Sequence, residues 1–279
     1  MRRRPCRYAP LCLMLLMTAL TACPARAEIV WHWEDRFTPA EQHSLKTWIT
    51  RTLHAVEDLV APLPFDIHVH FYRLVDRGEP VPWANTRRGR RQGVNFHVDP
   101  AFPAEAFYTD WTAAHELSHL LIPSLGEANS WFAEGFASYM QYQVMQHMDV
   151  LDADKIRAVY RERMERAESV FQYPRMPFVI AARALRVAGD YPTYYWGGAT
   201  YFLRADAALR QRAGSSLTAM LRDYVACCRD NEPSIGELVQ QFDRLEGESL
   251  FADLLLEFQT RPGFPRYRGA LRALAADST

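Results

Sequence analysis

Apolar residues recur at helical spacing in the segment after Thr38 and then alternate with polar residues. The spacing from Leu45 to Leu59 predicts an amphipathic helix, which Thr38 and Glu41 begin as a capping box and which ends near residue 62. Alternation over 65–71 predicts a half-buried strand, with His68 and His70 on its solvent face. A second strand is predicted over 93–98.

Helical periodicity dominates beyond residue 110. The predicted helices begin near Asp110 and then cover about 130–148, 152–171, 178–188, 195–212, 215–226 and 233–259. We therefore expect an α+β fold, with a small N-terminal mixed α/β portion (28–105) that has a short sheet, followed by a mainly helical portion (106–279).

The first 27 residues have the pattern of a secretory signal: basic residues, a short apolar stretch and then small residues. Two alternative cleavage sites fit this segment. Cleavage after Ala27 would release residues 28–279, whereas the segment ending in Cys23 is similar to a bacterial lipoprotein box, in which Cys23 carries lipid. Either way we expect an exported protein, periplasmic or membrane-anchored as a lipoprotein, without a transmembrane segment in the mature chain.

The charge balance argues against a nucleic-acid partner. The chain has 32 basic and 33 acidic residues, and removal of residues 1–27 takes away five arginines, which leaves 27 − 33 = −6. The arginine cluster at 87–91 is predicted to be a solvated turn. Of five cysteines, Cys227 and Cys228 remain after cleavage at Ala27, either bridged to each other or as two free thiols.

The segment AAHELSHLLI (113–122) places three ionisable side chains in an otherwise apolar helix. His115 and His119 are four residues apart and therefore share one helix face. Their burial is costly unless a partner compensates it. HExxH on a helix indicates two histidine zinc ligands and a glutamate, here Glu116, as general base.

A second acidic residue, Glu134, occurs in the aromatic segment WFAEGFASY (131–139). If Pro123 ends the first helix, a short loop lets a second helix return antiparallel and bring Glu134 to the two histidines. Two histidines and one glutamate form the three-ligand catalytic zinc set. Glu127, in the loop, is expected to be exposed and not to bind metal. The aromatic neighbours Trp131 and Phe132 are expected to be core residues.

HELSH followed by WFAEGFASY resembles the gluzincin (peptidase MA-like) metallopeptidases, and most closely the aminopeptidase N and glycyl aminopeptidase families. The resemblance implies a thermolysin-like helical portion, with one zinc ion at its junction with the α/β portion. It also implies hydrolysis of peptide or protein substrates. The segment YWGGA (195–199) resembles the one that supplies a transition-state tyrosine, which implies this role for Tyr195, with Tyr194 as its rival one position away.

The sequence departs from the family in two places. Fourteen residues separate His119 from Glu134, a shorter spacing than is usual. The strand motif that holds a substrate's free amine is missing, and residues 93–97, in a similar place, contain no glutamate. Exopeptidase and endopeptidase activity therefore both stay open, and the edge strand could bind extended peptide by strand addition.

A function of another class also fits the motifs. A catalytically inactive peptide-binding or assembly module could keep the scaffold and use zinc as a structural staple. The presence of Glu116 favours the enzyme, because a staple has no need of a general base. A three-ligand set also leaves a coordination position open, which a structural zinc site tends to close.

Overall fold

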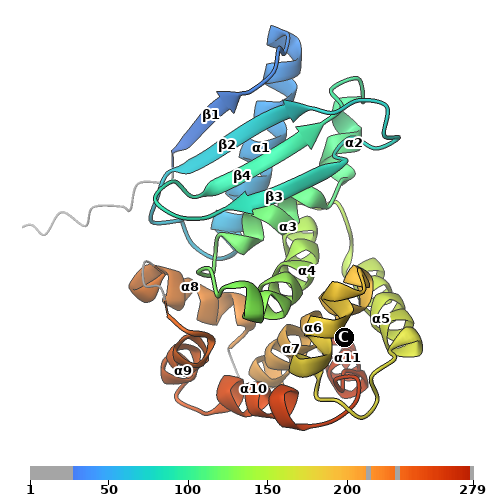
Figure 1. The fold of residues 1–279 in the computed structure, drawn as a ribbon. Helices are drawn as coiled ribbons and strands as arrows, with labels where there is room; N and C mark the ends of the chain where they lie inside the picture. Colours follow the sequence, from blue (N-terminus) through green and yellow to red (C-terminus); the bar gives the residue numbers. More distant parts are fainter. Residues whose placement is uncertain (1–27, 212–214, 230–232, 277–279) are drawn as a thin grey trace, which may run out of the picture.

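The computed structural model describes residues 28–211, 215–229 and 233–276, so the predicted signal segment and Cys23 lie outside the described residues. A small sheet forms the upper half of the molecule in Figure 1, and most of the helices form the lower half. The protein therefore has the predicted α+β architecture.

The sheet has four strands in the order β1-β2-β4-β3. Strands β1 and β4 pair in parallel with β2, whereas β3 lies antiparallel to β4 at the edge. The bounds are β1 Ile29–Trp33, β2 Ile67–Arg73, β3 Trp83–Arg87 and β4 Gly93–Val98. Alternate residues of β2 are buried on one face, as the alternating pattern predicted.

Helix α1 (Pro39–Leu59) packs on the buried face of the sheet. Its predicted capping box is confirmed, since Thr38 Oγ1 accepts from the backbone of Glu41 and the Glu41 carboxylate accepts from that of Thr38. Trp48 of α1 contacts Phe96 of β4, with ring centroids 5.2 Å apart. This contact joins α1 to the centre of the sheet.

Strands β1 and β3 were not predicted from the sequence. All five residues of β1 are partly exposed, and β3 combines one exposed with four partly exposed residues, so neither strand shows clear alternation. The strand predicted over 93–98 is confirmed as β4, which lies inside the sheet between β2 and β3. The edge strand beside the HExxH helix is β3.

The helices of the second half follow one another with short connections. Their bounds are α2 Ala104–Thr109, α3 Thr112–His119, α4 Ser130–His147, α5 Ala153–Val170, α6 Phe178–Val187, α7 Tyr191–Gln211, α8 Leu217–Cys228, α9 Ile235–Glu246, α10 Leu250–Thr260 and α11 Arg268–Ala276. The single helix predicted over 233–259 is wrong. Gly247 adopts a left-handed conformation (φ 74°) and ends α9 before α10 begins.

Helices α4 and α7 cross in backbone contact. A Cβ atom placed on Gly198 of α7 would lie 2.3 Å from the carbonyl oxygen of Trp131, and one on Gly135 would lie 2.3 Å from the backbone of Gly198. Around this crossing Trp131 and Phe132 are 1% and 0% exposed, which confirms the prediction that both belong to the core. The crossing fixes the amino-terminal half of α7 next to the first turns of α4.

Among the described residues, no helix combines the length and the apolar character that crossing a membrane requires.

We predict that Gly198→Ala destabilises the protein by about 1–3 kcal/mol or more, because the methyl group has no space between α4 and α7. Gly236→Ala in α9 is the matched control. An added Cβ there meets nothing within 4 Å, so the higher helix propensity of alanine should stabilise the protein by up to about 1 kcal/mol. Urea unfolding of both variants measures the difference. Equal stability of the two would contradict the proposed close crossing.

Candidate metal centre

Helix α3 places both histidines of the HExxH motif at the centre of the molecule. The Asp110 side chain accepts a hydrogen bond from the backbone of Thr112 (2.8 Å), so it caps the helix close to the predicted start. All eight residues of α3 are buried. The helix ends at His119, earlier than Pro123, because the next three residues form a tighter turn with i→i+3 hydrogen bonds.

Helix α4 returns Glu134 to the two histidines. The Glu134 Oε2 atom lies 3.2 Å from His115 Nε2 and 3.5 Å from His119 Nε2. Within residues 28–211, 215–229 and 233–276, this is the one group of three His, Cys, Asp or Glu side chains whose ligand atoms all lie within 4.8 Å of one another. Two imidazoles and a carboxylate form a donor set that suits zinc.

A second polar contact orients His115. Its Nδ1 lies 2.8 Å from Gln141 Oε1 of α4. An amide oxygen can only accept, so Nδ1 carries a proton, and Nε2, which faces Glu134, is the nitrogen that a metal would bind. Outer hydrogen bonds of this kind commonly fix the tautomer of a metal-binding histidine.

The charges of the group depend on one another. Burial alone would raise the pKa of Glu134, but the charge of His119 and the hydrogen bond from His115 hold that pKa well below its ordinary value. Burial would lower the pKa of His115, and Glu134 reverses this and raises it. Without metal, the buried carboxylate therefore needs a positive charge beside it, which a divalent cation also provides.

Glu116 is held by the edge strand. The Thr86 hydroxyl lies 2.7 Å from Glu116 Oε2, to which it donates, and 3.2 Å from the backbone oxygen of the same residue. Glu116 is 8% exposed and lines the same cleft as the two histidines. Thr86 was not predicted as a site residue, because the sequence pattern did not indicate β3.

Two arginines bind the carboxyl end of α3. Arg88 donates to the backbone oxygens of His119 (2.8 Å) and Ile122 (2.9 Å), and Arg229 donates to that of Leu120 (2.7 Å). Cations are favourable at this end of a helix. Burial and the nearby Arg229 lower the pKa of Arg88 to about 10, so Arg88 stays charged at neutral pH. The predicted solvated turn is therefore right for 89–91, which are exposed, and wrong for Arg88 and for Arg87, which ends β3.

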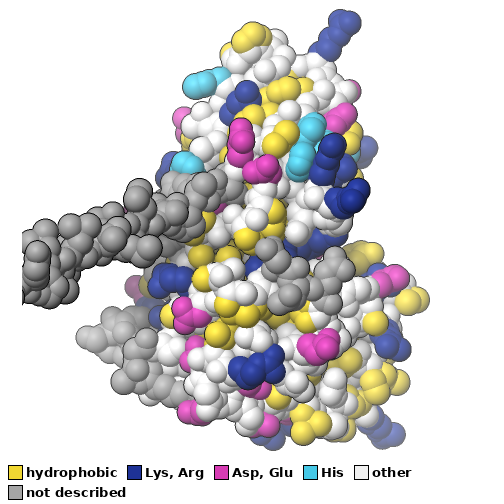
Figure 2. Space-filling view, turned by 90° about the vertical axis from the view of Figure 1, so that its left-hand side faces the viewer, with side chains coloured by type: hydrophobic (Ala, Val, Ile, Leu, Met, Phe, Trp, Pro, Cys, Tyr) yellow, Lys and Arg dark blue, Asp and Glu magenta, His cyan; other side chains and the backbone are white. Residues whose placement is uncertain are grey.

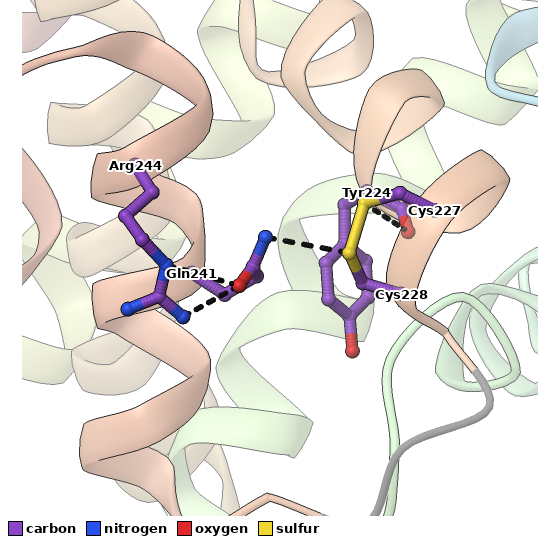
Figure 3. Close-up of a disulfide and its surroundings, with 5 residues drawn as sticks. All are labelled: Tyr224, Cys227, Cys228, Gln241 and Arg244. Atoms are coloured by element: carbon purple, nitrogen blue, oxygen red, sulfur yellow. Dashed lines mark hydrogen bonds between the residues drawn. A yellow bond between two sulfur atoms is a disulfide. The ribbon is translucent and has the colours of Figure 1, made fainter.

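The two cysteines, joined by a yellow bond in Figure 3, stand directly before Arg229 in the sequence. Cys227 and Cys228 form a disulfide at the end of α8, so of the two alternatives left open by the sequence the structure has the bridged form. Gln241 of α9 donates to Cys228 Sγ at 3.3 Å. Because the bridge joins neighbours, it closes no long loop and fixes only the chain that leads into Arg229.

The structure distinguishes the two candidate tyrosines. The ring of Tyr195 lines the cleft, with its centroid 6.1 Å from that of His115. Burial and the nearby Glu134 and Glu116 raise the pKa of Tyr195, which therefore keeps its proton. Tyr194 is 3% exposed, and its hydroxyl lies 2.5 Å from Oγ of the partly buried Ser130, so this hydroxyl is engaged in a hydrogen bond at the start of α4.

Glu127, another acid of the cleft, pairs with an arginine outside the metal centre. Glu127 lies in the exposed turn before α4 and forms an ion pair with Arg186 of α6.

The cleft has a volume of about 620 Å³, which is in the range of small-molecule and peptide sites. Its walls are β3, α3, residues 124–127 and Tyr195, and its exposed aromatic residues are Trp83 and Trp111.

Comparison with known proteins finds similarity of fold. A variant of a two-domain M1 zinc metallopeptidase bound to L-arginine has a TM-score of 0.52 and 16% identity, over 83% of this chain and 46% of its own. A variant of an M1 zinc metallopeptidase from Deinococcus radiodurans, bound to a Tyr-Ser-Ala substrate, has a TM-score of 0.50 and 17% identity. This match covers 85% of this chain and 49% of the other. The chain spans about half the length of these structures. No family model and no curated protein matches the sequence.

We predict that the metal-free protein loses stability in acid through Glu134. The pKa of Glu134 in the folded protein lies below its ordinary value of 4.5. Its contribution to the free energy of unfolding is therefore present above pH 4.5 and is lost as the pH falls through the pKa of the folded protein. In Glu134→Gln, the slope of unfolding free energy against pH below 4.5 should decrease by up to about 1.4 kcal/mol per pH unit. Chemical unfolding with a chelator present, at several pH values, measures this slope.

Glu127→Gln is the control for this measurement. Its ion pair with Arg186 is exposed and should be screened by salt, so at high ionic strength the slope should equal that of the wild type. An unchanged slope in Glu134→Gln would show that the buried carboxylate is not stabilised by the histidines.

Proposed function

We propose that this protein is a zinc metallopeptidase of the gluzincin type, which binds one zinc ion and hydrolyses peptide bonds. The observation that carries the proposal is the convergence of His115, His119 and Glu134 in a cleft that also contains the carboxylate of Glu116. The similarity of fold to M1 zinc metallopeptidases supports it. The signal pattern of residues 1–27 further supports an exported enzyme, periplasmic or held by lipid at Cys23.

In this mechanism His115, His119 and Glu134 hold the metal. A bound zinc ion would lower the pKa of a water molecule and polarise the scissile carbonyl. Glu116 takes the proton of the attacking water and passes it to the leaving amine. The Thr86 hydroxyl fixes one oxygen of Glu116, so that the other oxygen is free to accept this proton.

Tyr195 is the proposed donor to the oxyanion that forms as water attacks. Its hydroxyl keeps its proton, because burial and the nearby acids raise its pKa, and its ring stands beside His115 in the cleft wall. A preorganised donor at this position stabilises the transition state more than the bound substrate.

The substrate is proposed to be an extended peptide that pairs with β3. This strand bonds to β4 on one side only, so its other edge offers backbone donors and acceptors toward the cleft. Strand addition of this kind recognises a peptide backbone independently of its end groups. Digestion of a peptide library, with the cleavage positions read by mass spectrometry, distinguishes endopeptidase from exopeptidase activity.

We predict that Glu116→Gln retains zinc and loses peptidase activity by about 10²–10⁴-fold, because the change removes the general base and none of the three ligands. Zinc content by elemental analysis and cleavage of a quenched fluorescent peptide measure the two effects. A chelator should abolish the wild-type activity and added zinc should restore it. If the wild type holds zinc and cleaves no peptide, the chain is instead a peptide-binding or assembly module.

We predict that Tyr195→Phe lowers kcat by about 10²-fold with little change in KM, as expected for a donor that acts mainly in the transition state. Tyr194→Phe is the matched control. It removes a hydroxyl that is hydrogen-bonded to Ser130 at the start of α4, so it should reduce stability and leave kcat nearly unchanged. The reverse result would move the role to Tyr194.

A further inference from the structure

Exposed apolar side chains are concentrated around α6. Of the nine large hydrophobic side chains that are exposed among the described residues, five fall between residues 170 and 191: Val170, Met176, Ile180, Val187 and Tyr191. Two of the others, Trp83 and Trp111, line the cleft already described. Figure 2 shows that hydrophobic side chains also reach the surface of the helical half on the face that it draws. Apolar side chains gathered in one short exposed segment mark a site of interaction.

Helix α6 has two apolar faces, and only one of them is buried. The buried face consists of Phe178, Ala181, Ala182 and Leu185. Phe178 packs there against Trp131 of α4 and Phe258 of α10, with ring centroids 5.9 Å apart in both pairs. Ile180 and Val187 are seven residues apart, so they share the other side of the helix, where they are 55% and 89% exposed. The core does not use this second face.

The end of the exposed face protrudes from the molecule. Val187 is the last residue of α6 and is followed by Ala188 and Gly189, which are also exposed. The chain turns at Gly189, which has a φ of 73°. A convex apolar tip cannot enclose a partner's side chain, as a concave ligand site does. It can insert into a fluid layer or into a hollow of another protein.

Basic side chains flank the exposed face. The segment 174–189 contains Arg175, Arg183 and Arg186 and no acidic residue. Arg183 lies four residues before Val187 and is therefore its neighbour on the helix surface. Arg186 forms an ion pair with Glu127, whereas neither Arg175 nor Arg183 forms one within the part of the chain that the structure describes. The apolar tip is thus accompanied by two exposed positive charges.

The nearest acids along the chain already have partners. Glu168 of α5 accepts hydrogen bonds from Tyr267 and Arg268. Asp190 accepts one from the backbone of Thr193 (3.2 Å) in the first turn of α7. The exposed face of α6 is therefore apolar and basic, although the whole chain is close to neutral, with 32 basic and 33 acidic residues. This combination of properties is typical of helices that lie on anionic lipid surfaces.

We propose that the exposed face of α6 binds the surface of a lipid bilayer that contains anionic headgroups. Ile180 and Val187 enter the boundary between headgroups and acyl chains, while Arg175 and Arg183 contact the phosphate groups. Tyr191 is 50% exposed at the start of α7, and its apolar ring with a polar hydroxyl suits the same boundary.

A lipid surface fits these observations better than another protein does. In a symmetric pair of chains the same patch would face itself, which would bring arginines close to arginines. A folded partner would need a hollow shaped for the protruding Val187 and acids around that hollow, whereas a fluid boundary layer requires no matching shape. The contact is independent of the proposed peptidase activity and of lipid at Cys23.

The test measures binding of the exported protein to vesicles by co-sedimentation. Every form carries Cys23→Ser, so that no lipid is attached. The protein should bind vesicles of phosphatidylcholine with phosphatidylglycerol, and pure phosphatidylcholine more weakly. The double variant Ile180→Glu/Val187→Glu should reduce the affinity for anionic vesicles by about tenfold or more, because burial of one such side chain already accounts for that factor. Arg183→Gln should reduce it about fivefold, and high salt should remove this difference.

Val75→Glu is the matched control. Val75 is 42% exposed and follows β2 in the sheet half, so an added charge there should leave vesicle binding unchanged. Circular dichroism checks that each variant folds. Equal binding by the double variant and Val75→Glu, or no preference for anionic vesicles, would overturn the proposal. Self-association that the double variant abolishes, without vesicle binding by the parent protein, would assign the face to a second copy and overturn it as well.

Discussion

The structure depends on how it compensates the ionisable groups that α3 buries. His115, Glu116 and His119 lie on a helix with every residue buried, where unpaired charges would be costly. Each group has a partner outside α3: Gln141 and Glu134 of α4 contact the histidines, and Thr86 of β3 contacts Glu116. The sheet and the helical portion therefore meet at α3 because both supply these partners.

The carboxyl end of α3 also has polar atoms that need partners inside the protein. A short helix that ends inside the protein leaves backbone oxygens without helical partners. Arg88 and Arg229 bind three of these oxygens, and both guanidinium groups are held among protein atoms. Arg229 follows the Cys227–Cys228 bridge directly, so the end of α8 contributes to the position of the metal-binding helix.

The sequence predicted the helices and the candidate site better than the sheet. Helical spacing identified α1, α4 and α5, and the capping box identified the start of α1. The shorter interval before Glu134 still brings it to His115, because α4 begins directly after a tight turn. The failures have physical causes. Strand β3 is an edge strand with one partner and no alternating burial, so Thr86 and the buried role of Arg88 could not be seen. A single left-handed residue, Gly247, interrupts an otherwise continuous helical pattern.

The contacts of the cleft acids bear on how a substrate would be held. Asp110 caps α3 and Glu127 pairs with Arg186, so both carboxylates have structural partners. Thr86 is the residue of β3 that contacts the candidate base, Glu116. An acidic residue in place of Thr86 would set a second negative charge against Glu116, and the two carboxylates would repel each other. The edge strand therefore supplies no anion beside Glu116 for a terminal ammonium group. Under the proposed function, the backbone of β3 contributes to substrate affinity, and a backbone ladder does not require the substrate to end at the cleft.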